Sequence, residues 1–411
     1  MKRLQNLNHM KTLYTLLICC LTFVMQGQQK NKTDFVLGNG LNFSFDGGNY
    51  KFNIGGFIQP AFLYEQVSGL DAENEFNSKR SFLQFSGEAK KEKVSFLFQL
   101  DYSLSEPMLD AWVAYHPTKN SSITLGQKQS FLNNREMIYR EDRLQFNNRS
   151  FLSETLSNTG REFGVFVESR FGKNFGIVPM IAVTSGDGRN SFGANSRDSD
   201  IGGVKYGGRL DLYPLGYFKA GNDLTSTDLG REESLKFVIG GAASQNKGAS
   251  NANGEGHGDF LLFDVEGKNN LPDYTQVYID FLMKYQGFSV LAEYANTTAS
   301  NIDQTYIDMD ATQILVPQQI SEFLYLGDSY NIQAGYVTVS GMSFDVRYES
   351  ANSEFENDTN SALQDMDSFT FGVSKYFFND NSLKIQTAYT SLNPSVGSKT
   401  TQVELMVQIA F

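Results

Sequence analysis

The sequence predicts an all-β protein: a transmembrane antiparallel β-barrel of about 16 strands, with short periplasmic turns and long extracellular loops. Three observations predict this fold class. Apolar and polar residues alternate in segment after segment, the chain is rich in aromatic residues with 34 Phe and 20 Tyr, and it ends inside an alternating segment. Side chains of a strand point alternately to its two faces, so each such segment has one apolar and one polar flank.

Residues 1–27 have the features of a secretory signal peptide. Three basic residues and no acid occur before an apolar run over 13–25, and Gly27 offers a small residue at a plausible cleavage point. The run is shorter than the roughly 20 residues that a membrane-spanning helix needs, so a transmembrane anchor is the weaker alternative.

Charge and cysteine content exclude several classes of protein. Removal of residues 1–27 would change the formal net charge from −12 to −15, so nucleic-acid binding through a basic surface is not expected. Both cysteines, Cys19 and Cys20, lie in the leader, so the mature chain has no disulfide framework. No later stretch approaches the length of an apolar membrane helix.

Residues 28–39 are expected to form a short periplasmic segment, and residues 40–411 to form the barrel. In VSFLFQLDY, residues 94–102, every even-numbered position is apolar or aromatic, whereas Gln99 and Asp101 lie on the other flank. A soluble β-sandwich also alternates. Charged residues on the second flank of many strands favour a barrel around water, because burial of charge in a dry core is costly.

The connections also alternate in length. Residues 46–48 and 379–382 form short turns, whereas 132–158, 245–258 and 297–328 form long polar loops. Short turns at one end and long loops at the other are typical of outer-membrane barrels.

The final segment, VELMVQIAF, predicts the strand that closes the barrel. An unpaired edge in hydrocarbon would leave backbone groups without hydrogen bonds, so the last strand must pair with the first. A terminal Phe411 after alternating apolar residues also resembles the signal that delivers outer-membrane proteins to their assembly machinery. We therefore expect that machinery as a partner, and the outer membrane of a Gram-negative cell, with its lipid bilayer, as the location.

Several segments carry a family resemblance in the same order along the chain. GLNFSFDGGNYKFNIGGFIQPAF (40–62) looks like an opening hairpin, and LGQKQSF (125–131) is similar to a Gly-Gln-x-Lys-x-Pro-Phe motif, with Ser130 where Pro is usual. On the basis of these two segments and five others, the chain resembles the phosphate-selective porin O and P family over nearly its whole mature length. The other matching segments are 160–167, 184–190, 207–216, 287–294 and 369–389.

The resemblance implies a homotrimer of 16-stranded barrels, each with a lumen lined by basic residues that pass phosphate or a related anion. It also implies that the third long loop, which follows Lys128, folds inward and narrows the barrel. This loop carries Arg135, Arg140 and Arg143, and the planar guanidinium group can donate paired hydrogen bonds to phosphate. The alternative is a solvated loop whose arginines pair with nearby acids.

Strand parity places further cations on the polar flank that faces the lumen. Carboxylates such as Asp211, Asp345 and Glu349 share that flank, so a lumen of mixed charge is expected. The candidate pore-lining and anion-binding residues are Arg80, Lys128, Arg135, Arg140, Arg143, Lys205, Arg209, Lys236 and Arg347.

The function predicted from these features is passive diffusion of small hydrophilic solutes, with anions such as phosphate or polyphosphate preferred. The alternatives are a general or oligosaccharide-permeable porin, and a barrel that serves as an adhesion surface. An enzyme is not expected, because neither His116 nor His257 lies in a recognisable nucleophile pattern. No cofactor or metal is expected either, although the acidic stretches 196–200 and 307–310 leave calcium as a minor alternative.

Overall fold

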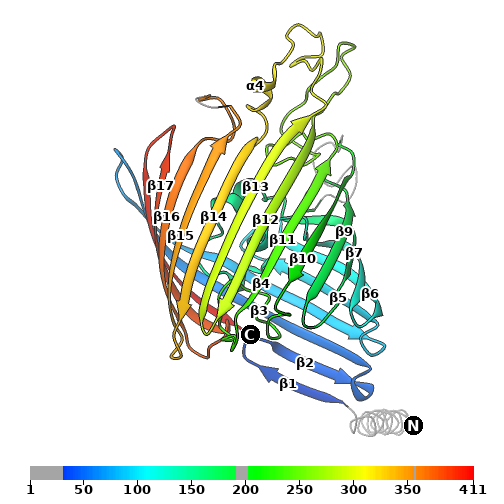
Figure 1. The fold of residues 1–411 in the computed structure, drawn as a ribbon, viewed down its shortest axis with the longest axis vertical. Coiled ribbons are helices and arrows are strands. Elements are labelled where there is room, and N and C mark those ends of the chain that lie inside the picture. Colours follow the sequence, from blue (N-terminus) through cyan, green and yellow to red (C-terminus); the bar gives the residue numbers. More distant parts are fainter. Residues whose placement is uncertain (1–30, 191–201, 356–357) are drawn as a thin grey trace, which may run out of the picture.

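The structure is a computed structural model that describes residues 31–190, 202–355 and 358–411 (Figure 1). The expected signal peptide, residues 1–27, and the acidic stretch 196–200 lie outside the described residues. Within the described ranges, no helix has both the length and the apolar character needed to cross a membrane.

In the described chain, sixteen antiparallel strands, β3 to β18, form a closed barrel, which confirms the predicted fold class (Figure 1). The ring closes where β18 pairs with β3, from Thr400↔Val67 to Ala410↔Phe57. The strands are β3 (Tyr50–Val67), β4 (Glu73–Ala89), β5 (Val94–Asp101), β6 (Met108–Thr118), β7 (Ser121–Gln129), β8 (Arg161–Ser169), β9 (Gly176–Thr184), β10 (Lys205–Tyr213), β11 (Lys236–Asn246), β12 (Asp273–Tyr285), β13 (Phe288–Ser300), β14 (Gly327–Val337), β15 (Met342–Ser353), β16 (Met366–Tyr376), β17 (Leu383–Pro394) and β18 (Thr400–Ala410).

An N-terminal hairpin extends the sheet beside the barrel. It consists of β1 (Lys32–Val36) and β2 (Gly40–Phe45), and a single 3-10 turn, η2 (Asp46–Gly48), leads into β3. The start of β3 pairs with β2, and its later part pairs with β18. The backbone N–H of Phe411 donates to the carbonyl of Gly56 at 2.9 Å, so the chain end is hydrogen-bonded into the seam.

The outer face of the barrel is apolar and the inner face is polar. On β15, Phe344, Val346 and Tyr348 are exposed on the outside, whereas Asp345 and Arg347 between them are buried inside. Every strand of the ring has two partners, and the apolar belt needs a bilayer to cover it. These are the features of a protein that spans the outer membrane.

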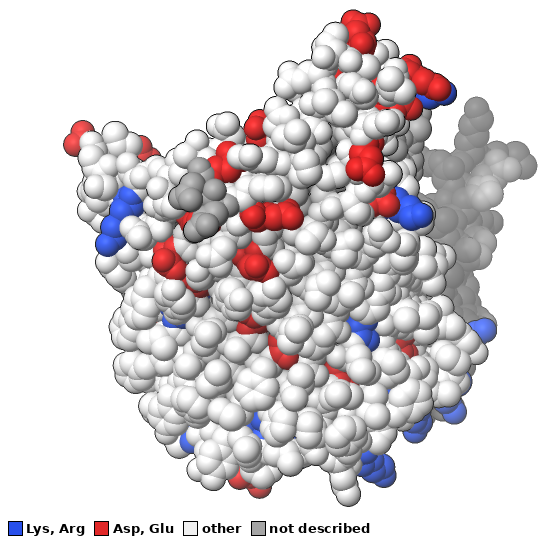
Figure 2. Space-filling model, turned by 45° about the horizontal axis from the view of Figure 1, so that its top comes forward, with Lys and Arg blue, Asp and Glu red and all other residues white. Residues whose placement is uncertain are grey.

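The connections differ strongly between the two ends of the barrel. Residues 286–287 and 338–341 make tight turns at one end. At the other end, loops 247–272 and 301–326 rise above the rim, where α4 (Pro317–Ile320) lies (Figure 1). Figure 2 shows acidic side chains gathered mostly toward this loop end on the face in view.

One connection at the short-turn end departs from the expected pattern. Segment 214–235, between β10 and β11, is long and folds into the mouth of the barrel. The expectation of short periplasmic turns is therefore wrong at this position. The segment exceeds a turn because it is hydrogen-bonded inside the mouth, where Lys284 of β12 donates to its backbone carbonyls.

The outward apolar belt can be tested with a charge at mid-strand. Val346→Lys should lower the free energy of unfolding by about 2–4 kcal/mol, because a lipid-facing ammonium must leave water. The measurement is urea-dependent unfolding in lipid vesicles. Val265→Lys, in an extracellular loop where the side chain is 62% exposed, is the matched control and should change little. Equal effects of the two substitutions would contradict a lipid-facing position for Val346.

Candidate pore constriction

Loop 130–160, between β7 and β8, lies inside the barrel. It contains the short helices α2 (Arg135–Ile138) and α3 (Phe151–Thr155), and between them a 3-10 turn, η3 (Glu141–Arg143). The side chains of Leu152 and Leu156 are fully buried against wall residues that include Tyr278. The loop therefore fills much of the lumen, in the place where the family resemblance predicts a constriction.

A cluster of buried ions fixes the loop to β10 and β12. Arg135 of the loop contacts Asp211 at 2.9 Å and Asp280 at 2.6 Å. Arg209 of β10 contacts the same two carboxylates at 2.8 and 2.5 Å. Gly240 on the adjacent strand leaves room for the cluster, because a Cβ there would collide with the guanidinium of Arg209. Two positive and two negative groups thus neutralise one another.

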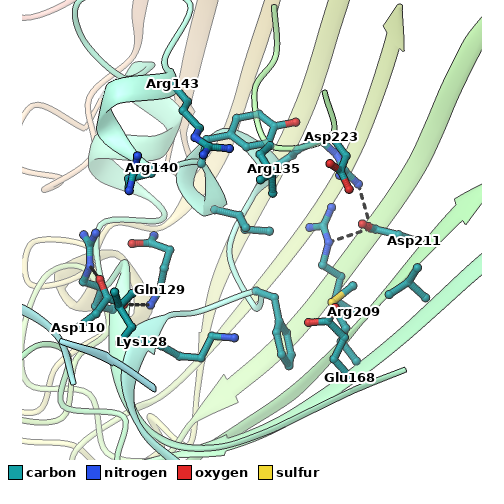
Figure 3. A pocket seen from close by; sticks show the side chains of 18 of the residues that line it. Asp110, Lys128, Gln129, Arg135, Arg140, Arg143, Glu168, Arg209, Asp211 and Asp223 are labelled. Carbon is teal, nitrogen blue, oxygen red and sulfur yellow. Dashed lines mark hydrogen bonds and ion pairs between the residues drawn. The ribbon is translucent and has the colours of Figure 1, made fainter. Parts of the chain in front are cut away.

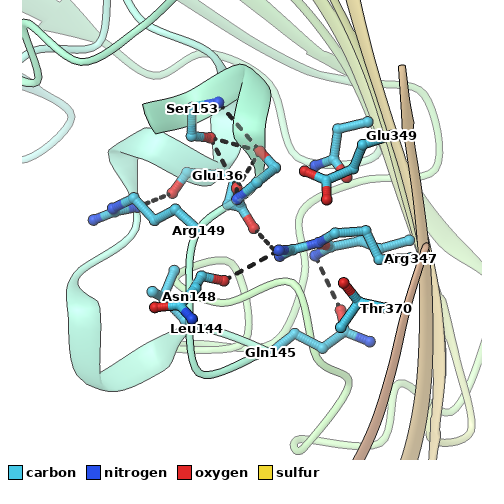
Figure 4. A network of polar contacts seen from close by, with 12 residues as sticks. Glu136, Leu144, Gln145, Asn148, Arg149, Ser153, Arg347, Glu349 and Thr370 are labelled. Atoms are coloured by element: carbon cyan, nitrogen blue, oxygen red, sulfur yellow. Dashed lines mark hydrogen bonds and ion pairs between the residues drawn. The ribbon is translucent and has the colours of Figure 1, made fainter. Parts of the chain in front are cut away.

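A second contact fixes the loop to β15 (Figure 4). The guanidinium of Arg347 donates to the carboxylate of Glu136 and, at 3.1 Å, to the carbonyl of Asn148. The hydroxyl of Ser150 also donates to Glu136, at 2.6 Å. Burial raises the pKa of Glu136, but the charge of Arg347 and the hydrogen bonds from Ser150 outweigh it, so the pKa is lowered. Glu136 therefore remains a carboxylate within the loop.

A third contact joins the loop to β6 and β8. Glu141 accepts from Arg149 at 3.1 Å and from Arg161 at 3.0 Å, and Arg161 also contacts Asp110 at 2.9 Å. Burial raises the pKa of Glu141, but the opposite effect of Arg161 and Arg149 is larger, so the pKa lies well below its usual range. Arg161 is not among the pore residues that the sequence predicts.

The remaining strand candidates take different positions. Arg80 points inward and donates to Gln59 at 3.0 Å and to the carbonyl of Asn147 at 3.2 Å. Lys205 is buried 3.5 Å from Glu162. Lys236 instead donates to the carbonyl of Leu215 at the rim. Each of these three cations, like Arg135, Arg209 and Arg347, is therefore held by a hydrogen bond or an ion pair to another group of the protein.

A cavity of about 550 Å³ remains between the loop and the wall formed by β5 to β10 (Figure 3). Figure 3 shows Lys128 and Arg140 on one side of it and Asp211 and Asp223 on the opposite side. Its charged lining comprises seven cations and four acids. The cations are Lys128, Arg135, Arg140, Arg143, Arg161, Arg170 and Arg209, and the acids are Asp110, Glu168, Asp211 and Asp223.

Lys128 and Arg143 differ from the other cations of this cavity. Neither forms an ion pair with any residue in the part of the chain that the structure describes. The ammonium of Lys128 lies 5.3 Å from the ring centre of Phe166 and 5.7 Å from that of Phe131. Aromatic faces attract a cation without neutralising its charge. Both residues therefore present positive charge to the cavity.

Arg140 also lines the cavity but carries a partner. Its guanidinium contacts Asp142 at 2.5 Å and donates to Gln84 at 2.6 Å, and 27% of its side chain stays exposed. Burial raises the pKa of Asp142, but the charge of Arg140 and its hydrogen bond lower it by more. The pKa is therefore lowered, and this carboxyl stays ionised. Arg140 is thus held in place with a compensated charge.

Much of the remaining wall is apolar. A wall of this kind suits the carbon body of an organic solute as well as a bare ion, because apolar contact releases ordered water. The apolar and aromatic lining residues are Leu97, Trp112, Phe131, Ile138, Tyr139, Val178, Met180, Tyr213 and Leu224.

Solved structures with this architecture identify the class of fold. The outer membrane channel DcaP of Acinetobacter baumannii gives a TM-score of 0.53 at 12% identity, with 90% of this chain and 99% of that chain covered. OmpT of Vibrio cholerae with loop L8 deleted gives 0.52 at 12% identity, covering 88% and 100%. The fold is that of an outer-membrane β-barrel.

The trimer form of V. cholerae OmpT gives a TM-score of 0.50 at 9% identity, covering 88% of this chain and 99% of that chain. At such low identities the likeness concerns the fold alone. A scan of protein-family models and a search of curated proteins find no match to this chain. The function must therefore be inferred from the barrel's own residues.

Removal of one carboxylate tests the buried cluster. Asp280→Asn leaves two buried guanidinium groups with one acid, which should lower the free energy of unfolding by about 3–5 kcal/mol. Urea unfolding in detergent measures this change. Asp303→Asn, at an exposed loop position, is the control and should shift stability by less than about 0.5 kcal/mol. Similar stabilities for the two variants would contradict the anchoring role.

Proposed function

We propose that the protein is a passive channel of the outer membrane for small hydrophilic solutes, with a preference for anions. The observation that carries this proposal is the excess of cations on the cavity wall, seven against four acids. Lys128 and Arg143 contribute charge that no ion pair compensates. The proposed process is diffusion and involves no catalysis.

Local charge governs selection in such a channel more than total charge does. The net charge of −12 arises largely from acids outside the constriction, many of them in loops. Charges farther than about 8 Å away are strongly screened at physiological salt. An anion at the cavity would exchange part of its hydration for Lys128 and Arg143, loosely enough to leave again.

Phosphate and polyphosphate are the anions we propose first. The resemblance of residues 40–62 and 125–131 to the phosphate-selective porins supports this choice, and so does the ability of guanidinium groups to hold phosphate oxygens. Within this proposal, Arg143, Lys128 and Arg140 contact the anion. The ion-paired Arg135, Arg209 and Arg347 position the loop that carries Arg140 and Arg143.

A general or oligosaccharide-permeable channel is the second candidate. The aromatic lining favours it, since Trp112, Tyr139 and Tyr213 offer surfaces for the carbon faces of uncharged solutes. The reduction of the single-channel current by phosphate, compared with its reduction by a neutral sugar, separates the two candidates.

We further propose a homotrimer that is inserted through recognition of Phe411. The trimer follows from the family resemblance, and one structurally similar protein is described as a trimer form. Crosslinking in native membranes, followed by gel electrophoresis, would show a species of three chains.

Reversal potentials in a tenfold KCl gradient test the anion preference. The unmodified channel should be anion-selective, and Lys128→Gln combined with Arg143→Gln should lower the anion-to-cation permeability ratio about twofold or more, because two uncompensated charges are removed. Millimolar phosphate should reduce the chloride current of the unmodified channel only.

Lys268→Gln is the control, because this side chain is 73% exposed in a distant loop. It should leave both readouts unchanged. Cation selectivity in the unmodified channel would overturn the anion preference, and lack of any conductance would overturn the channel itself.

A further inference from the structure

Segment 214–235 enters the mouth of the barrel at the end where the other connections are tight turns. Lys284, on the inner face of β12, is fully buried beneath it. The Lys284 ammonium donates to the carbonyls of Thr225 at 2.7 Å and Thr227 at 2.8 Å, and to the carbonyl of Asn222. A buried ammonium enclosed by carbonyls of one segment fixes that segment's backbone.

Asp228 adds a second fixed point and is fully buried. Its carboxylate accepts from the backbone N–H of Gly287 at 2.7 Å, in the turn between β12 and β13. It also accepts from the N–H of Glu232 at 3.1 Å and the side-chain amide of Asn222 at 2.8 Å. Loss of such bonds would leave a buried charge without partners, so the segment is held rigidly in the mouth.

The segment also touches the constriction loop directly. The hydroxyl of Thr225 donates to the backbone carbonyl of Arg143 at 2.7 Å. Asp223, two residues earlier, pairs with Arg170 of the wall at 3.0 Å. The two inserted segments thus meet at Arg143, one from the side of the long loops and the other from the side of the turns.

This meeting point lies between two cavities. Asp223 and Leu224 line the 550 Å³ cavity described above. Residues 220–222 and Thr225 line a second cavity of about 340 Å³, which reaches residues 379–382 of a turn at the mouth. Arg140 and Arg143 line both cavities. A solute that moves from the first cavity to the second passes these two arginines and the inserted segment.

We propose that segment 214–235 is a second constriction element, which together with loop 130–160 forms the periplasmic exit of the channel. Residues 220–225 set the width of this exit, and Asp223 places an acid beside the arginines that the solute passes. The inference rests on the proposed channel activity, but it does not depend on which ion the channel prefers.

Cysteine labelling tests the exit. Both cysteines of the chain lie within residues 1–27, so an introduced cysteine is the sole thiol once the leader is removed. Ala220→Cys places a thiol at an exposed position that lines the second cavity. A bulky thiol reagent should lower the single-channel conductance of this variant by about half or more. Ser340→Cys, exposed in another turn at the same end, is the matched control and should not respond.

Mass spectrometry confirms that the introduced cysteine is labelled in each of the two variants, Ala220→Cys and Ser340→Cys. Full labelling of Ala220→Cys with unchanged conductance overturns the second constriction and leaves the channel proposal standing. Lack of conductance before labelling overturns the channel proposal, and this inference with it.

A shortened variant gives the opposite readout. Replacement of residues 220–230 by a short Gly-Ser link, combined with Lys284→Met to remove the ammonium that would lose its partners, should raise the conductance about twofold or more. A folded shortened variant with unchanged conductance also overturns the proposal.

Discussion

The structure depends on one electrostatic constraint: the outer face of the barrel meets hydrocarbon, so charged strand residues must point into the lumen. Once there, they lie close together in a narrow, partly dry space, where isolated charge is unfavourable and paired charge is tolerated. Arg209, Asp211 and Asp280 on the wall satisfy this constraint together with Arg135 of the inserted loop. The folded loop therefore neutralises the wall, and the wall positions the loop.

This pairing determines which charged residues remain available to attract a solute. A cation in a buried ion pair holds the loop in position. A cation without an acidic partner adds positive electrostatic potential at the cavity. Lys128 and Arg143 belong to the second group, and Arg140 lies between the groups because its charge is compensated but its surface is accessible. A simple count of arginines in the loop would have treated all of them alike.

The sequence was sufficient to predict the fold, because alternation is local. The side chains of Asp345 and Arg347 can be assigned to the inner face from their neighbours alone, and the end of the chain predicts closure against the first barrel strand. The ion pairs could not be predicted in the same way. Glu136 and Arg347 are 211 positions apart, and only the curvature of the closed ring brings them together.

Segment 214–235 was missed for a related reason. Its polar composition is that of any loop, and the residues that hold it, Lys284 and Gly287, belong to a later hairpin. An unusual signal was nevertheless present: a lysine at an inward position near the end of a strand needs a partner, and no acid within β12 faces it at that level.

A double-mutant cycle between Glu136 and Arg347 tests whether ion pairs across the lumen hold the constriction loop in place. Glu136→Gln, Arg347→Gln and the double variant would be compared by urea unfolding in detergent. The losses of unfolding free energy in the two single variants should not be additive, with a coupling of about 1–3 kcal/mol, because each substitution alone leaves the other charge buried without its partner. Additive losses within about 0.3 kcal/mol would contradict it.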